Sequence, residues 1–124
     1  MKWQSTLLIV GAVASQAFAG EDTIECTINQ KYTRADDLQD GIDYLNGLSG
    51  QPTAEAGKCN RVSCSYGAGI YVCSDDGKDH PLKSWGTVAD VTQKLADKCI
   101  SGETINGRLH SSDGWGVIIQ GASC

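Results

Sequence analysis

The chain has 124 residues, with 15 acidic and 10 basic side chains and a formal net charge of -5 at pH 7. This length accommodates a single domain of ordinary size and excludes a multidomain enzyme. The acidic balance excludes a broad basic surface that neutralises phosphates, so we expect no general nucleic-acid binding.

The amino-terminal segment has the pattern of a secretory signal peptide. Lys2 precedes the apolar stretch 7–14, and Ala17-Phe18-Ala19 supplies small residues at the cleavage positions. The apolar stretch is far shorter than the roughly 20 residues that span a bilayer, so we expect release without a membrane anchor. We therefore assign residues 1–19 to a signal peptide and residues 20–124 to one secreted domain, which we expect to be monomeric.

The cysteines indicate a disulfide framework. An even number in a small exported chain is typical of paired thiols. No CxxC pair occurs, and His80 and His110 stand apart from metal-ligand spacings, so we expect no metal and no cofactor. We predict three disulfides, whose pairing the sequence leaves open, among Cys26, Cys59, Cys64, Cys73, Cys99 and Cys124.

The first elements of the predicted mature chain are a strand and a helix. Residues 23–28 alternate with a period of two and contain β-branched residues, which predicts a half-buried strand. Thr33 followed three residues later by Asp36 resembles a helix capping box. Apolar residues then recur with helical spacing before Gly47, so we expect them to face the core: Leu38, Ile42 and Leu45.

The middle of the chain predicts a hairpin between two polar loops. Residues 49–58 are small and polar and contain a proline, which indicates a surface loop. The β-rich runs 61–66 and 70–73 flank the turn Gly67-Ala68-Gly69. Residues 74–81 contain three carboxylates and one imidazole without the spacing of a calcium loop, so we interpret them as a structural turn.

A second helix and a second hairpin complete the chain. Thr87 lies three residues before Asp90 and is another candidate helix cap. The following apolar stripe predicts a helix with Cys99 on its buried face, where a disulfide would staple the helix to the sheet: Val88, Val91, Leu95 and Cys99. Residues 107–110 and 115–120 flank a Ser-Ser-Asp-Gly turn. We expect the last strand to be central, with Ile118 in the core and a disulfide fixing the terminus of the strand.

The order of these elements predicts an α+β fold. It is a disulfide-stapled, two-layer sandwich with an antiparallel sheet and both helices on one face.

Three segments carry a resemblance to small cysteine-rich proteins secreted by filamentous fungi. They are the block Cys-Asn-Arg-Val-Ser-Cys-Ser-Tyr-Gly-Ala-Gly-Ile-Tyr-Val-Cys, the predicted helix ending at Cys99, and the terminal Gly-Trp-Gly-Val-Ile-Ile-Gln-Gly-Ala-Ser-Cys. The element order is more loosely similar to the killer toxins of smut fungi, which have an α/β-sandwich fold. The resemblance implies a virulence effector that acts outside fungal cells or on a host, with later uptake by host cells open, and it assigns no catalytic residue.

We expect a non-enzymatic interaction protein, because the sequence contains no catalytic constellation. Loops held by a rigid scaffold commonly carry recognition, so the two polar loops are the candidate binding surface. Their candidate contact residues are Gln51, Glu55, Asp76, Lys78 and His80. The partner is a host or competitor protein or a glycan, for which Tyr66, Tyr71 and Trp85 are a candidate aromatic platform.

Two alternatives remain open. One is an antimicrobial protein similar to a killer toxin, which would need a specific receptor or channel because membrane-lytic peptides have cationic faces. The other is a small ribonuclease-like hydrolase. In that case His110 would be the acid or base, Glu103 its partner and Arg108 the phosphate clamp.

Overall fold

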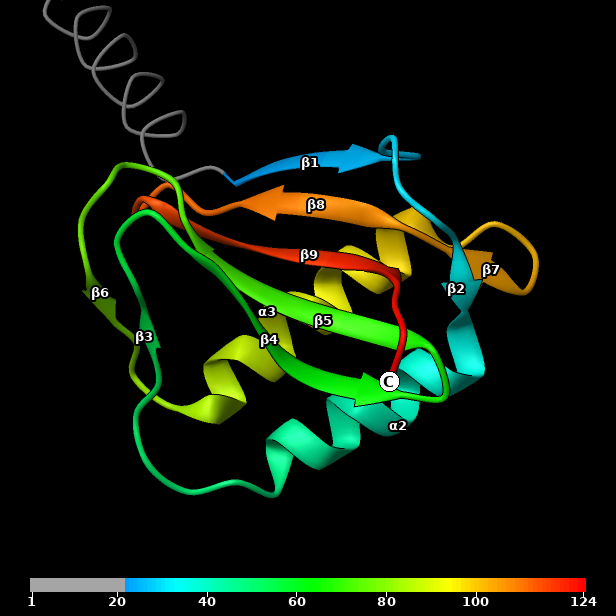
Figure 1. The fold of residues 1–124 in the computed structure, drawn as a ribbon, viewed down its shortest axis with the longest axis horizontal. Helices are drawn as coiled ribbons and strands as arrows, with labels where there is room; N and C mark the ends of the chain where they lie inside the picture. The colour runs from blue at the N-terminus through cyan, green and yellow to red at the C-terminus, as the bar shows by residue number, and fades with distance from the viewer. Residues whose placement is uncertain (1–21) are drawn as a thin grey trace, which may run out of the picture.

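The structure, a computed structural model, describes residues 22–124 (Figure 1). The predicted signal peptide, residues 1–19, lies outside the described residues. The elements are β1 (Thr23–Cys26), β2 (Thr33–Arg34), α2 (Ala35–Asn46), β3 (Thr53–Ala54), β4 (Cys59–Ser65), β5 (Ala68–Ser74), β6 (His80–Pro81), α3 (Trp85–Cys99), β7 (Thr104–Ile105), β8 (Gly107–His110) and β9 (Trp115–Gly121).

Five strands form one antiparallel sheet in the order β1-β8-β9-β5-β4. The predicted order of main strands and helices is confirmed, and β9 is central as expected. The sequence interpretation missed two short pairs, β2 with β7 and β3 with β6. The second pair joins the two segments predicted as separate surface loops.

Both helices cover the same face of the sheet, so the predicted two-layer α+β sandwich is confirmed (Figure 1). Helix α2 contacts β4 and β5, α3 contacts β8 and β9, and the two helices contact each other. None of the helices within residues 22–124 is long and apolar enough to cross a bilayer.

The core lies between the helices and the sheet, where strand side chains alternate between two faces. Ile70 and Val72 of β5 and Val117 and Ile119 of β9 are buried against the helices. The predicted helical stripe of α2 is confirmed as buried, as are Val88, Leu95 and Cys99 of α3. Ile118, which we expected in the core, is only half-buried on the opposite face, because alternation turns it away from its two neighbours.

Both predicted helix caps are wrong. Helix α2 begins at Ala35, and its first N–H is satisfied by the carbonyl of Glu103 at 2.9 Å, whereas Thr33 belongs to β2. Helix α3 begins before Thr87, and the hydroxyl of Ser84 accepts from the Thr87 N–H. Tertiary pairing therefore fixes the first helix, and a different side chain caps the second.

The β4–β5 hairpin is confirmed, but its turn is shorter than the glycine pattern predicts. Ser65 pairs with Ala68, so the loop consists of Tyr66 and Gly67 alone. Both have positive φ, 50° and 91°, as in a type I′ turn. Gly69, expected in the turn, is a buried residue of β5.

Three disulfides staple the sandwich, and all six cysteines are paired as predicted. Cys26–Cys99 joins β1 to the end of α3, which confirms the expected staple between helix and sheet. Cys59–Cys73 links β4 to β5. Cys64–Cys124 fixes the carboxyl terminus against β4.

Candidate functional site

The helix-free face of the sheet carries a row of side chains that crosses all five strands. Strand pairing aligns Glu25 with Arg108, Arg108 with Ile118, Ile118 with Tyr71, and Tyr71 with Arg61. Paired residues share a face, and Tyr71 points away from the buried Ile70 and Val72 beside it. The row therefore places charged groups near both edges of the sheet and an apolar centre between them.

A charged cluster occupies the β1–β8 side of this face. His110 Nδ1 lies 2.9 Å from Asp75 Oδ2, and His110 Nε2 lies 3.0 Å from Glu25 Oε1. Arg108 Nη2 donates to the other oxygen of Asp75 at 3.0 Å. Both ring nitrogens of His110 therefore face a carboxylate oxygen, that of Asp75 on one side and that of Glu25 on the other.

Glycine at position 116 allows Asp75 to reach this cluster. Asp75 follows β5, and its backbone N–H donates to the Gly114 carbonyl at 2.8 Å. A Cβ at Gly116 would lie 3.0 Å from Asp75 Oδ2 and would also collide with the carbonyl of Leu109. The bare backbone of β9 therefore lets the carboxylate cross to β8, where its side chain is only 17% exposed.

The structure brings together two of the three residues of the hydrolase alternative. His110 and Arg108 meet through Asp75, whereas Glu103 lies between α3 and β7 with its carboxylate 3.8 Å from Arg34. Glu25 takes the place beside His110 that we had assigned to Glu103. Sequence reasoning missed Glu25 and Asp75 because they are 85 and 35 residues from His110 and only strand pairing unites them.

A groove opens beside the charged cluster, over the ends of β5 and β9. We call it the tyrosine groove and define it by Lys31, Tyr32, Arg34, Arg61, Tyr66 and Tyr71, which line it together with Gln120 and the tail 121–123. Its volume is about 680 Å³. A smaller recess of about 280 Å³ shares Gln30 and Gln120 with it and extends to Glu25 and Arg108.

Hydrogen bonds to backbone carbonyls fix the walls of the groove. Asn106 Nδ2 donates to the carbonyls of Ile28 and Gln30 at 2.9 and 2.8 Å, which holds the β1–β2 segment. The Gly121 N–H donates to the Lys31 carbonyl at 2.9 Å, and a Cβ at Gly121 would lie 2.8 Å from the Tyr32 carbonyl. The absence of a side chain at Gly121 therefore allows the segment to close onto β9.

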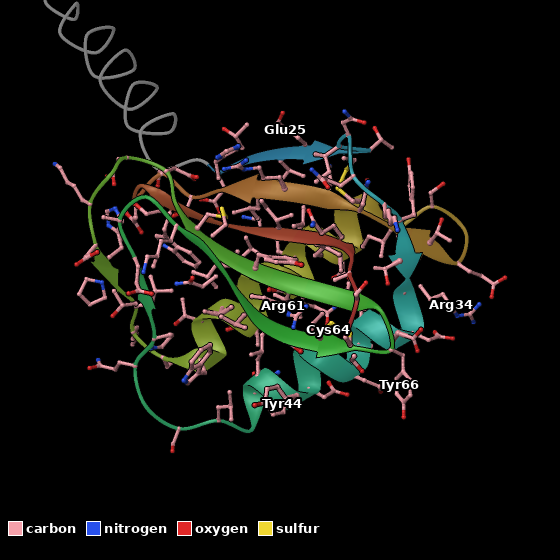
Figure 2. The ribbon with its side chains drawn as sticks, in the orientation of Figure 1. Glu25, Arg34, Tyr44, Arg61, Cys64 and Tyr66 are labelled. Carbon is pink, nitrogen blue, oxygen red and sulfur yellow. A yellow bond between two sulfur atoms is a disulfide. The ribbon has the colours of Figure 1, made fainter. Side chains whose placement is uncertain are left out.

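Tyr66 stands at the rim of the groove, at the tip of the β4–β5 hairpin (Figure 2). Its side chain is 83% exposed, and its φ of 50° is a conformation that favours glycine or asparagine over a bulky residue. The Cys64–Cys124 disulfide anchors the hairpin just before the turn. An exposed aromatic ring is thus held on a rigid support at a backbone position that disfavours it.

The two loops predicted as the binding surface lie side by side at the far end of β5. Thr53 pairs with Pro81, and Ala54 with His80. Hydrogen bonds in or beside these loops hold several candidate side chains: Glu55 accepts from Asn60 of β4, Gln51 donates to the Lys83 carbonyl, and Asp76 contacts His80 at 2.7 Å. Their polar groups therefore order the loops, and Lys78 presents its side chain at an exposed position.

The Asp76–His80 contact also affects ionisation. The hydrogen bond from His80 lowers the pKa of Asp76 below its usual value of 3.8, with further help from the Lys78 backbone N–H. Asp76 and Asp75 are adjacent in sequence, yet Asp75 faces the charged cluster and Asp76 faces His80.

The three residues of the candidate aromatic platform do not lie together, because the sheet separates Trp85 from the two tyrosines. Tyr66 and Tyr71 line the tyrosine groove, while Trp85 lies in a different hollow with Asn60 and Val72, on the face that the helices cover. Tyr32, which the sequence analysis did not consider, joins the two tyrosines instead.

Within residues 22–124, no group of three or more His, Cys, Asp or Glu side chains is arranged to hold a metal ion. Comparison with protein families, curated proteins and solved structures found no match to this chain.

Proposed function

We propose that this chain is a secreted, effector-like interaction protein that acts outside the producing cell or on a host and binds its partner with the tyrosine groove. Exposed Tyr66, held at positive φ, is the observation that carries the proposal. A left-handed conformation costs an L-residue about 1–2 kcal/mol. Strained backbone conformations cluster at functional sites, and tyrosine is among the residues enriched in binding hot spots.

The disulfides support the same proposal. Cys64–Cys124 anchors the hairpin that carries Tyr66, and the tail beside it contributes the Ser123 carbonyl that accepts from Arg61 at 2.9 Å. A preformed surface loses little conformational freedom when it binds. The framework also suits an oxidising, extracellular setting, in agreement with the predicted signal peptide.

Tyr66→Asn tests this proposal, because asparagine is favoured before glycine in a type I′ turn. We expect the variant to be as stable as the wild type or more stable by about 1 kcal/mol, since the backbone strain is relieved. We also expect it to lose species that oxidised, tagged wild-type protein captures from host or competitor-cell extracts. Melting curves of both proteins report folding independently of capture.

Lys78→Ala is the matched control, because this exposed residue lies on the paired loops at the opposite end of β5. We expect its capture to equal that of the wild type. Undiminished capture by Tyr66→Asn together with loss in Lys78→Ala would move the binding surface to the paired loops. Capture that survives reduction of all three disulfides would contradict a role for the stapled fold.

The second candidate function is an RNA-cleaving hydrolase, which the Glu25–His110–Asp75 contacts favour. In this reaction Glu25 takes the proton of a ribose 2′-hydroxyl while the 2′-oxygen bonds to phosphorus. His110 gives its Nε2 proton to the departing 5′-oxygen as the phosphorus–oxygen bond breaks, and Asp75 orients the ring.

RNA cleavage by purified protein tests this candidate. Removal of an acid or base should lower the rate by about 10²–10⁴-fold in both Glu25→Gln and His110→Ala. Glu103→Gln, which alters a carboxylate remote from the cluster, should cleave as fast as the wild type. Absence of cleavage by the wild-type protein rejects the candidate and leaves the interaction function.

A further inference from the structure

Basic side chains gather in the tyrosine groove although the whole chain is acidic. Lys31, Arg34 and Arg61 are three of the chain's ten basic residues, and Asp37 is the one carboxylate among the described residues that line the groove with them. The net charge of the chain is -5. Asp36 and Glu103 also lie near Arg34, so the positive charge of the groove rests on Lys31 and Arg61, which form no ion pair with the described residues and can select an anionic ligand.

The two arginines remain available to a ligand. Arg34 is 60% exposed, and its contacts with Asp36, Asp37 and Glu103 are all 3.8–3.9 Å long. Exposed pairs of this kind contribute little to stability and exchange readily for a better acceptor. Arg61 donates one N–H to the Ser123 carbonyl, which orients the guanidinium and leaves its other donors for a planar anion.

The other groups on this face suit a ligand rich in hydroxyls. The groove floor is the face of a sheet whose backbone N–H and C=O groups are committed to the strand ladder, so recognition depends on side chains. Tyrosines offer a flat apolar ring and a hydroxyl. The amides of Gln30 and Gln120, shared by the groove and the adjoining recess, can donate to and accept from hydroxyl groups.

The groove and recess together are suited to an extended chain. They meet at Gln30 and Gln120 and follow the row of side chains from Arg61 to Arg108. Arg61 and Arg108 are three strand spacings apart, a span of about 14 Å. A linear ligand with flat rings, hydroxyls and carboxylates complements the cations, aromatic rings and amides of the groove, while Arg108 at the far end stays paired with Asp75.

We propose that the tyrosine groove binds an acidic oligosaccharide, a linear glycan whose sugar rings carry carboxylate groups. This inference rests on the proposed function and specifies its ligand. The carboxylates pair with Arg61 and Arg34, the sugar rings lie against Tyr66 and Tyr71, and the hydroxyls meet the two glutamines. Single-stranded RNA shares the aromatic and cationic contacts, but its affinity depends on charge neutralisation along the backbone, which an acidic chain opposes.

Calorimetric titration with hexagalacturonate tests the inference, and maltohexaose serves as an uncharged probe of equal length. We expect the acidic probe to bind, its affinity to fall in high salt, and maltohexaose to bind at least about tenfold more weakly, the scale of one lost charge-assisted pair. Tyr66→Asn and Arg61→Gln should each weaken binding about tenfold. Lys78→Gln removes the same charge outside the groove and should bind like the wild type.

Arg61→Gln also removes the hydrogen bond to the Ser123 carbonyl and could weaken binding by loosening the tail. Arg34→Gln removes a groove cation without this contact and therefore separates the two effects. Loss of binding in Arg61→Gln without any loss in Arg34→Gln, accompanied by a lower melting temperature, would assign Arg61 a structural role and overturn its pairing with the ligand. Equal affinity for the two hexasaccharides would refute selection by charge. Tighter binding of an oligouridylate would identify the ligand as nucleic acid.

The binding titration tests the acidic glycan, and partner capture tests the interaction function. Failure of hexagalacturonate to bind, combined with Tyr66-dependent capture of a partner, would refute the acidic glycan and leave the interaction function intact. Failure in both assays would refute both.

Discussion

Removal of the Cys64–Cys124 disulfide should destabilise the domain by about 4 kcal/mol in the double variant Cys64→Ala/Cys124→Ala. The crosslink closes a loop with a sequence separation of 60 residues. The chain-entropy relation gives a free-energy difference of about 4 kcal/mol for a loop of this length. The other two disulfides shorten this loop by a few residues at most. The denatured chain therefore keeps most of the conformational entropy that the Cys64–Cys124 crosslink removes.

The folded state should survive the loss, because hydrogen bonds also hold the tail. The Ala122 N–H donates to the Gly67 carbonyl at 2.8 Å, and Arg61 donates to the Ser123 carbonyl at 2.9 Å. We therefore expect a lower urea midpoint without loss of cooperativity, measured by fluorescence of the buried Trp115.

Cys59→Ala/Cys73→Ala is the matched comparison, since its sequence separation is only 14 residues. The same relation gives about 3 kcal/mol for this crosslink. A loss below about 1 kcal/mol in Cys64→Ala/Cys124→Ala would refute the entropic reasoning, because it would mean that the denatured chain is already restrained near the tail.

Three further predictions concern the core, a close backbone approach and acid stability. Leu95→Ala should cost about 2–5 kcal/mol in unfolding free energy, while Ile118→Ala on the helix-free face should cost about 1 kcal/mol; equal losses in chemical denaturation would contradict the alternation. Gly107→Ala should cost about 1–3 kcal/mol, because its Cβ would lie 2.9 Å from Cys99 Sγ, whereas Gly47→Ala has no contact closer than 3.5 Å and should melt like the wild type. Because the pKa of Asp76 is lowered in the folded state, its carboxylate stabilises the fold at pH values above 3.8, the usual pKa, and this contribution is lost as the pH falls through the lowered pKa. Asp76→Asn should therefore flatten the acid limb of a stability–pH curve. An unchanged limb would count against the His80 contact.

Local patterns predicted the elements and the fold class because each depends on neighbours in sequence. Helical spacing identified Leu38 and Leu95 as core residues, and turn residues marked both hairpins. The apolar run of β9 was harder, since three consecutive apolar residues fit either face of a strand. Only the packed helices show that Ile118 belongs to the exposed side.

The candidate site was less predictable because long-range pairing assembles it. Glu25 and His110 come from the two ends of the domain, and the tyrosine groove joins the β1–β2 segment, a hairpin tip and the tail. The left-handed conformation of Tyr66 also lacked a local indication, because asparagine or glycine is the usual residue there. The polar loops gave a stronger compositional pattern, yet several of their side chains are hydrogen-bonded to nearby residues of the protein.

The alternation along β5 and β9 has an evolutionary consequence. Ile70, Val72, Val117 and Ile119 fill the interior, while Tyr71, Ile118 and Gln120 between them face outward. Each of these two strands therefore encodes folding and recognition at alternating positions. Outward residues can diversify rapidly under selection while every inward neighbour is retained, so a lineage could acquire new ligand specificities on an unaltered scaffold.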